Sequence, residues 1–75
     1  MKTYEQRDEA EHAALELANY TAAPVLLMQR FSDASRSWFN RFEYTVGLRT
    51  DWQVRNFGWH LATAHRSGLL EIIKR

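Results

Sequence analysis

Residues 46–58, VGLRTDWQVRNFG, contain the signals that decide the predicted fold. Gly47 stands where a left-handed residue would end a helix. Thr50 and Gln53 have the capping-box spacing, in which the two side chains satisfy the first free backbone amides of a helix. We therefore predict that one helix ends at Gly47 and that another begins at about Asp51.

The helix that begins at Asp51 is predicted to continue to Ser67, with Gly68 ending it. Its apolar residues recur at intervals of three and four positions, as one face of a helix requires: Val54, Phe57, Leu61 and Ala64. The helix before it is predicted to start in the cap-rich segment 32–35 and to run to about Thr45. Its apolar members are Trp38, Phe39, Phe42 and Val46.

Two further helices are predicted in the first half of the chain. One runs from about Tyr4 to Tyr20, behind a capping box that starts at Thr3. The other runs from about Pro24 to Phe31 and is apolar on nearly all sides, which indicates a place at the centre of the core. The segment 69–75 fits a β-strand and a short terminal helix equally well, because a short apolar run is ambiguous.

These elements predict a mostly α fold, a compact three- to four-helix domain with room for one short C-terminal β-strand. A chain of 75 residues is long enough for one domain, which covers residues 1–75. Ten aromatic residues are enough to condense a core. We expect an ordered single domain.

Charge is distributed unevenly along the chain. Residues 1–20 carry two basic and five acidic side chains, a net charge of −3. Residues 21–75 carry eight basic and four acidic side chains, a net charge of +4. This polarity fits a basic face that meets an anion or an acidic protein, and it also fits ordinary solvated helix faces.

The second half of the chain resembles a helix-turn-helix or winged-helix DNA-binding domain, over residues of about 24–73. Three landmarks carry the resemblance: Val46-Gly47-Leu48 at the end of a helix, Gln53-Val54-Arg55-Asn56 near the start of the next, and Ser67-Gly68-Leu69-Leu70 at the entry to a wing. The interval from Gly47 to Gly68 is longer than in that family, and the chain offers no return strand for the wing.

The resemblance implies a transcription regulator that binds DNA. The start of its recognition helix would enter the major groove. Arginine, glutamine and asparagine suit base edges there, which selects Arg49, Gln53, Arg55 and Asn56. Phosphate contacts would come from Arg36, Arg41 and Arg66.

A second class of function stays open beside DNA binding. Exposed aromatic residues near arginine are typical of protein-binding hot spots, and Trp52, Arg55 and Trp59 would form such a surface. The protein would then be a small effector, of the kind phages encode, that inhibits or redirects a host machine such as RNA polymerase or a defence complex. The isoelectric point of about 8.2 is lower than DNA-binding domains usually have and favours this class.

Catalytic, metal and cofactor sites are not expected. The chain has no cysteine and no glycine-rich phosphate loop, and His60 and His65 are five residues apart, where a helical zinc pair would be four apart. We therefore expect no enzyme activity and no small-molecule substrate. The sequence also shows no membrane-spanning or export segment, which predicts a cytoplasmic protein, and it leaves room for a homodimer.

Overall fold

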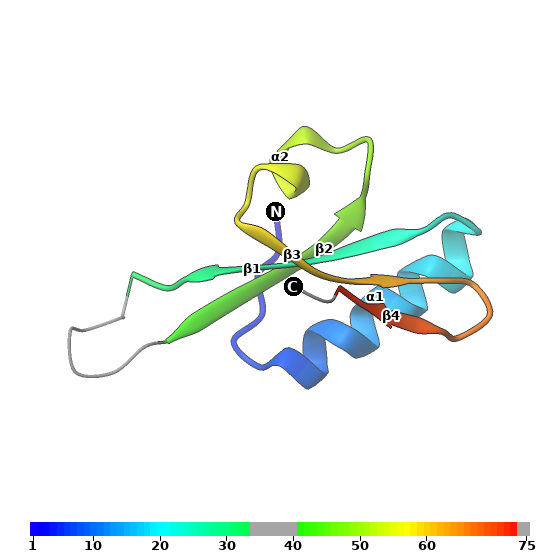
Figure 1. Ribbon diagram of the computed structural model, residues 1–75, viewed down its shortest axis with the longest axis horizontal. Coiled ribbons are helices and arrows are strands. Elements are labelled where there is room, and N and C mark those ends of the chain that lie inside the picture. Colours follow the sequence, from blue (N-terminus) through cyan, green and yellow to red (C-terminus); the bar gives the residue numbers. More distant parts are fainter. Residues whose placement is uncertain (34–40, 74–75) are drawn as a thin grey trace.

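The computed structural model describes residues 1–33 and 41–73, and these form a four-stranded antiparallel sheet instead of a helical bundle. The elements are α1 Arg7–Thr21, β1 Val25–Phe31, β2 Phe42–Leu48, α2 Trp52–Arg55, β3 Trp59–Ala64 and β4 Leu70–Ile72. The strand order is β2-β1-β3-β4, with α1 beneath the sheet and α2 above it in Figure 1. The predicted mostly α fold is therefore wrong.

Strand β1 replaces the helix that was predicted over Pro24–Phe31. Val25 and Leu27 are buried against α1, whereas Leu26 and Met28 are buried on the side of α2. A central strand that is covered on both faces is apolar on both, so its sequence lacks the alternation of a half-buried strand. The same continuous run of apolar residues suggested a buried helix.

Strand β2 replaces the end of the predicted third helix. Phe42, Tyr44 and Val46 face α1, and the residues between them face the other side, among them the fully buried Thr45. Gly47 lies inside this strand and ends no helix. A Cβ atom on Gly47 would come within 2.5 Å of Val54 Cγ2, so glycine is what allows α2 to approach the sheet closely. The start of that predicted helix, with Trp38 and Phe39, lies outside the described residues.

Helix α1 confirms the predicted first helix, although it starts later. Its N-cap is Gln6, which makes no side-chain cap bond, so the capping box predicted at Thr3 is wrong. Ala10, Ala14 and Ala18 are fully buried at four-residue spacing. These small side chains let the helix backbone lie close to the sheet. Helix α1 thereby covers most of one face of the sheet.

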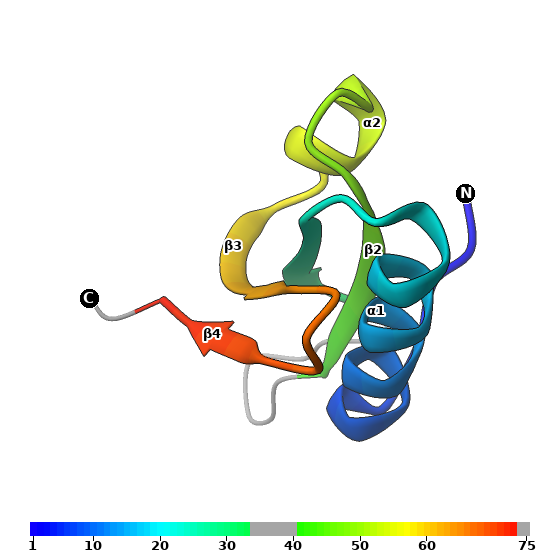
Figure 2. The ribbon, with the colours of Figure 1, turned by 90° about the vertical axis from the view of Figure 1, so that its right-hand side faces the viewer.

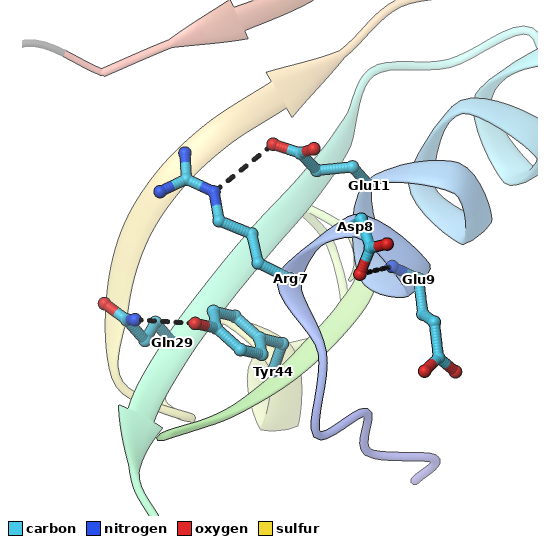
Figure 3. A network of polar contacts seen from close by, with 6 residues as sticks. All are labelled: Arg7, Asp8, Glu9, Glu11, Gln29 and Tyr44. Carbon is cyan, nitrogen blue, oxygen red and sulfur yellow. Dashed lines mark hydrogen bonds and ion pairs between the residues drawn. The ribbon is translucent and has the colours of Figure 1, made fainter. Parts of the chain in front are cut away.

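Polar contacts mark the place where α1 begins. Gln29 Nε2 donates a hydrogen bond to the Tyr44 hydroxyl at 3.1 Å, which joins β1 to β2 near the first turn of the helix (Figure 3). Arg7 and Glu11 form an ion pair of 3.2 Å along the helix. These contacts satisfy polar groups at the margin of an otherwise apolar packing layer.

The predicted helix from Asp51 to Ser67 is also wrong, because only its first turn is helical. Asp51, one residue after the predicted cap, accepts a hydrogen bond from Gln53 N–H at 3.0 Å and starts α2. The chain then passes so close to β1 that a Cβ atom on Gly58 would lie 1.9 Å from Gln29 O. Directly after that close approach, the chain becomes β3.

A tight hairpin joins β3 to β4. Gly68 N–H bonds His65 O at 3.0 Å, and His65 N–H bonds Leu69 O at 2.8 Å. Gly68 has φ of +88°, the left-handed conformation that closes a three-residue hairpin loop. Of the two alternatives left open for 69–75, the structure has a strand at Leu70–Ile72.

The resemblance to a helix-turn-helix or winged-helix domain is consequently not supported by the structure. Its three landmarks fall in a strand, in a single helical turn and in a hairpin loop. Figure 2 shows α1 and α2 on different sides of the strands, and α2, the other helix among the described residues, is only four residues long. No helix in residues 1–33 and 41–73 is long and apolar enough to cross a bilayer.

Candidate functional site

The side of the sheet that carries α2 holds a group of exposed basic and aromatic side chains around a shallow groove. We call this region the α2 surface; it consists of the groove lining, Leu26, Met28, Arg49, Arg55 and His60, together with Trp52 on α2, and of these Arg49, Trp52 and Arg55 are exposed. Trp52 and Arg55 are one helical turn apart, and Arg49 lies in the turn that leads from β2 into α2.

Apolar packing fixes α2 to the sheet. Val54 and Phe57 are 2% and 6% exposed and form a buried cluster with Leu26 and Met28. A helix of four residues has too few backbone hydrogen bonds to be stable alone, so this cluster must hold it in place. Trp52 and Arg55 point away from it and are exposed.

Arg30 also helps to hold α2 against the sheet, on the same side. Its guanidinium group lies 4.0 Å from the centroid of the Phe57 ring and forms an ion pair with Glu43 on the neighbouring strand. Stacking on the ring and pairing with a carboxylate both restrict this arginine. Arg30 therefore contributes to the support of α2 and adds no free charge to the α2 surface.

The groove beside α2 has a volume of about 380 Å³ and is lined by Leu26, Met28, Arg49, Arg55 and His60. Its apolar lining comes from two side chains that are almost fully buried. His60 Nε2 lies 2.8 Å from Ala62 O and 3.0 Å from Thr63 Oγ1. Because a carbonyl oxygen only accepts, Nε2 carries the proton in this arrangement, and these contacts hold the ring on the groove wall.

Arg49 and Arg55 make no ion pair with any residue in the described part of the chain, unlike Arg7 and Arg30. Guanidinium groups that are exposed and unpaired are well placed to bind carboxylate or phosphate groups. The acidic residues of the first twenty positions lie mostly on α1, across the sheet. The separation of charge between the two faces is partial, because Arg41 lines a hollow with Glu5 and Phe42 and Arg66 lies in the β3–β4 loop.

The structure brings together only some of the residues predicted to contact DNA. Arg49, Gln53 and Arg55 are near one another and exposed, whereas Asn56 uses its side-chain amide to bond Trp52 O at 2.8 Å. The predicted phosphate contacts are dispersed: Arg41 precedes β2 and Arg66 lies in the β3–β4 loop, at opposite ends of the sheet.

Seven residues of strand separate those two ends, a length of roughly 20 Å. The predicted set of DNA contacts therefore does not form one recognition helix with flanking phosphate contacts. Arg36, the remaining member of the set, lies outside the described residues.

The predicted protein-binding group of Trp52, Arg55 and Trp59 is divided between the two faces. Trp59 lies on the α1 side, in an aromatic cluster with Phe31 and Phe42. The centroid of its ring lies 5.5 Å from that of Phe31 and 6.2 Å from that of Phe42. Positions 52 and 59 would share a helical face, but the chain changes from helix to strand between them. Trp59 is therefore excluded from the α2 surface.

The sequence interpretation missed Leu26, Met28 and His60 as members of a surface. The two apolar residues were assigned to a central helix, and His60 was considered only as a metal ligand. Across residues 1–33 and 41–73, no three histidine, cysteine or acidic side chains are grouped as a metal ion would need. Only the strand pairing, which places His60 opposite Met28, reveals the groove.

Comparison with protein-family models, with curated proteins and with solved structures found no match for this chain. The geometry of the α2 surface is therefore the basis of the functional argument.

Proposed function

We propose that the protein is a small, non-enzymatic binding protein that uses the α2 surface to engage an acidic patch on a partner protein. One observation carries the proposal: Arg49 and Arg55, which form no ion pair within residues 1–33 and 41–73, line a groove with Leu26 and Met28, next to the Trp52 indole, which is 64% exposed. This proposal keeps the second of the two classes that the sequence left open.

The chemistry of the surface fits a protein partner. Tryptophan and arginine are the residue types most enriched among those that dominate binding energy at protein interfaces. The groove exposes small parts of Leu26 and Met28 that an apolar side chain could contact, while the arginines that line it can pair with carboxylates. A partner with an apolar residue among acidic ones would satisfy both parts.

Duplex DNA is less well matched to the same surface. A domain that contacts several phosphates needs a continuous basic track, and the α2 surface has two unpaired arginines. Arg41 and Arg66 are too far apart along the sheet to extend it into one track. DNA binding stays a prediction from the sequence, and the recognition helix on which it rested is absent from the described residues.

The test is capture of partner proteins from a cell lysate treated with nuclease, using the immobilised full chain. We expect the wild type to retain a partner and Arg55→Glu to lose it by about tenfold or more, because the introduced carboxylate repels an acidic patch. Arg66→Glu is the matched control, since it makes the same charge change on an exposed arginine outside the α2 surface.

Two outcomes would contradict the proposal. Equal capture by the wild type and Arg55→Glu would show that the α2 surface is not the interface. Binding that vanishes on nuclease treatment, with a steep loss of affinity for duplex DNA above about 50 mM salt, would identify nucleic acid as the partner.

A further inference from the structure

The two edges of the sheet differ in how their backbone groups are satisfied. At the β2 edge, Tyr4 forms a pair of hydrogen bonds of 2.8 Å with Tyr44, and the buried Thr45 hydroxyl donates to Lys2 O at 2.8 Å. The N-terminal segment thus covers the middle of that edge. No comparable segment in the described residues pairs with the outer side of β4.

The hydrogen-bond pattern shows which groups of β4 are left open. Leu69 O accepts from His65 N–H, and Ile73 N–H donates to Leu61 O, so the backbone groups of both residues face β3. Backbone groups in an antiparallel strand alternate from one side to the other, so Glu71 also faces β3. The N–H and C=O groups of Leu70 and Ile72 therefore point outward.

Apolar side chains border this open edge. Leu69, Ile72 and Ile73 are 58%, 49% and 36% exposed, within five consecutive residues of which Glu71 is the one charged member. Open edges with exposed apolar side chains favour pairing with another strand, and proteins usually protect them with charge, proline or a covering segment. Here the protection consists of the short length of β4 and of Glu71.

We propose that β4 is the interface of a two-fold symmetric homodimer, in which it pairs antiparallel with β4 of a second copy. A second copy is favoured because the β2 edge is covered and the β4 edge is open. Head-to-tail association would need the β2 edge of one copy to pair with the β4 edge of the next, and the N-terminal segment obstructs it. Pairing of β4 with β4 of a second copy uses only the open edges and gives a closed dimer. The result is one continuous sheet of eight strands, four from the described residues of each copy.

Charge selects the register of this pairing. Placing Ile72 opposite the partner's Ile72 sets each Glu71 opposite an isoleucine, whereas a shift of the two-fold axis to Glu71 would place two carboxylates face to face. The apolar side chains of Leu70 and Ile72 then extend the layer that each chain packs against α1. Because the two-fold axis is perpendicular to the sheet, both α2 surfaces lie on the same side of the dimer.

Light scattering of the full chain over a concentration series up to about 500 µM tests the proposal. Short paired strands bury little area, so we expect a weak dimer, with a mass that rises from one chain toward twice 8.9 kDa. Ile72→Lys should weaken the dimer by about tenfold or more. Tyr20→Lys, which removes an exposed aromatic residue beside Tyr4 and Val46, on the β2 side of the sheet, should leave it unchanged.

Amide hydrogen exchange identifies the edge independently of these variants. The amide of Ile72 should exchange several-fold more slowly at high than at low concentration, while the amide of Glu71, which faces β3, should be protected at both. A mass of one chain at the highest concentration would overturn the proposal. A dimer that Ile72→Lys does not weaken, or one without added protection at Ile72, would overturn it equally.

Discussion

The two faces of this sheet are covered by helices of very different size. We assign the stability of the fold mainly to the face under the longer helix, and the proposed binding to the face that carries the shorter one. On one face, a helix of fifteen residues packs three alanines against Val25, Leu27 and Ala64 and leaves acidic side chains outside. On the other, a helix of four residues buries Leu26 and Met28 against Val54, and Arg49 and Arg55, which form no ion pair in the described part of the chain, line the groove beside it. The face under α1, the closed face, supplies most of the core, and the face that carries α2 holds the surface that we propose binds a partner.

The closed face should be most sensitive to loss of a side chain. We expect Leu27→Ala to lower the free energy of unfolding by about 3 kcal/mol, because Leu27 is fully buried and leaves a closed cavity. Leu26→Ala removes the same atoms from the neighbouring residue, but the space that it leaves is open to the groove. We therefore expect it to lower the free energy of unfolding by about 2 kcal/mol. Urea denaturation of both variants measures the difference, and a larger cost for Leu26→Ala would contradict the assignment of the two faces.

Contact between α2 and the sheet can be broken at Gly47. The Cβ atom of Gly47→Ala would overlap the stiff, fully packed Val54 side chain, and we expect a loss of about 1 to 3 kcal/mol. The Trp52 fluorescence should also change as α2 moves. Gly68→Asn is the control, since asparagine adopts the left-handed conformation readily and the position has open space around it. Equal stability of the wild type and Gly47→Ala would show that α2 does not pack here.

The start of α2 distinguishes the cap observed from the cap predicted. Asp51→Ala should cost about 1 kcal/mol, because it leaves the Gln53 amide without its side-chain acceptor. Thr50→Ala should have almost no effect, although the sequence pattern had assigned the cap to that residue. Thermal unfolding of the two variants decides between them, and the reverse order of stability would favour the capping box.

The smallest effect is expected on the outer side of α1. Arg7 and Glu11 are partly exposed, and the ion pair between them should contribute about 0.5 kcal/mol or less. Glu11→Gln should therefore leave the unfolding midpoint nearly unchanged at physiological salt. A loss of more than about 1 kcal/mol would mean that the acidic side of α1 supports the fold more than its exposure indicates.

The sequence predicted the helix α1 and the helical start near Asp51, and it failed for the strands for a definite reason. Residues four apart lie on one side of a helix and also on one side of a strand. Phe42 and Val46 satisfied both patterns, and the alternation of Phe42, Tyr44 and Val46 with Glu43 and Thr45 was the signal for β2. Aromatic and β-branched residues in that segment supported the strand as well.

The candidate site was predictable only in part. Arg49, Trp52 and Arg55 are close in sequence and come together in the structure because α2 carries Trp52 and Arg55 and the turn before it carries Arg49. His60, Leu26 and Met28 join them through pairing of distant strands and a register shift between Leu27 and Met28, which no local pattern reveals. Trp59 was misplaced because its spacing from Trp52 was interpreted on a continuous helix.

The central claim is that the α2 surface, and not the face under α1, binds an acidic partner. It is tested most directly by a nuclear magnetic resonance titration of the labelled full chain with poly-glutamate, a defined acidic polypeptide. We expect backbone shift changes to cluster at Arg49, Trp52, Arg55 and His60, to weaken with rising salt and to be absent from the outer side of α1. Changes that cluster on α1 or at Arg66, or no change below about 50 mM salt, would contradict the account.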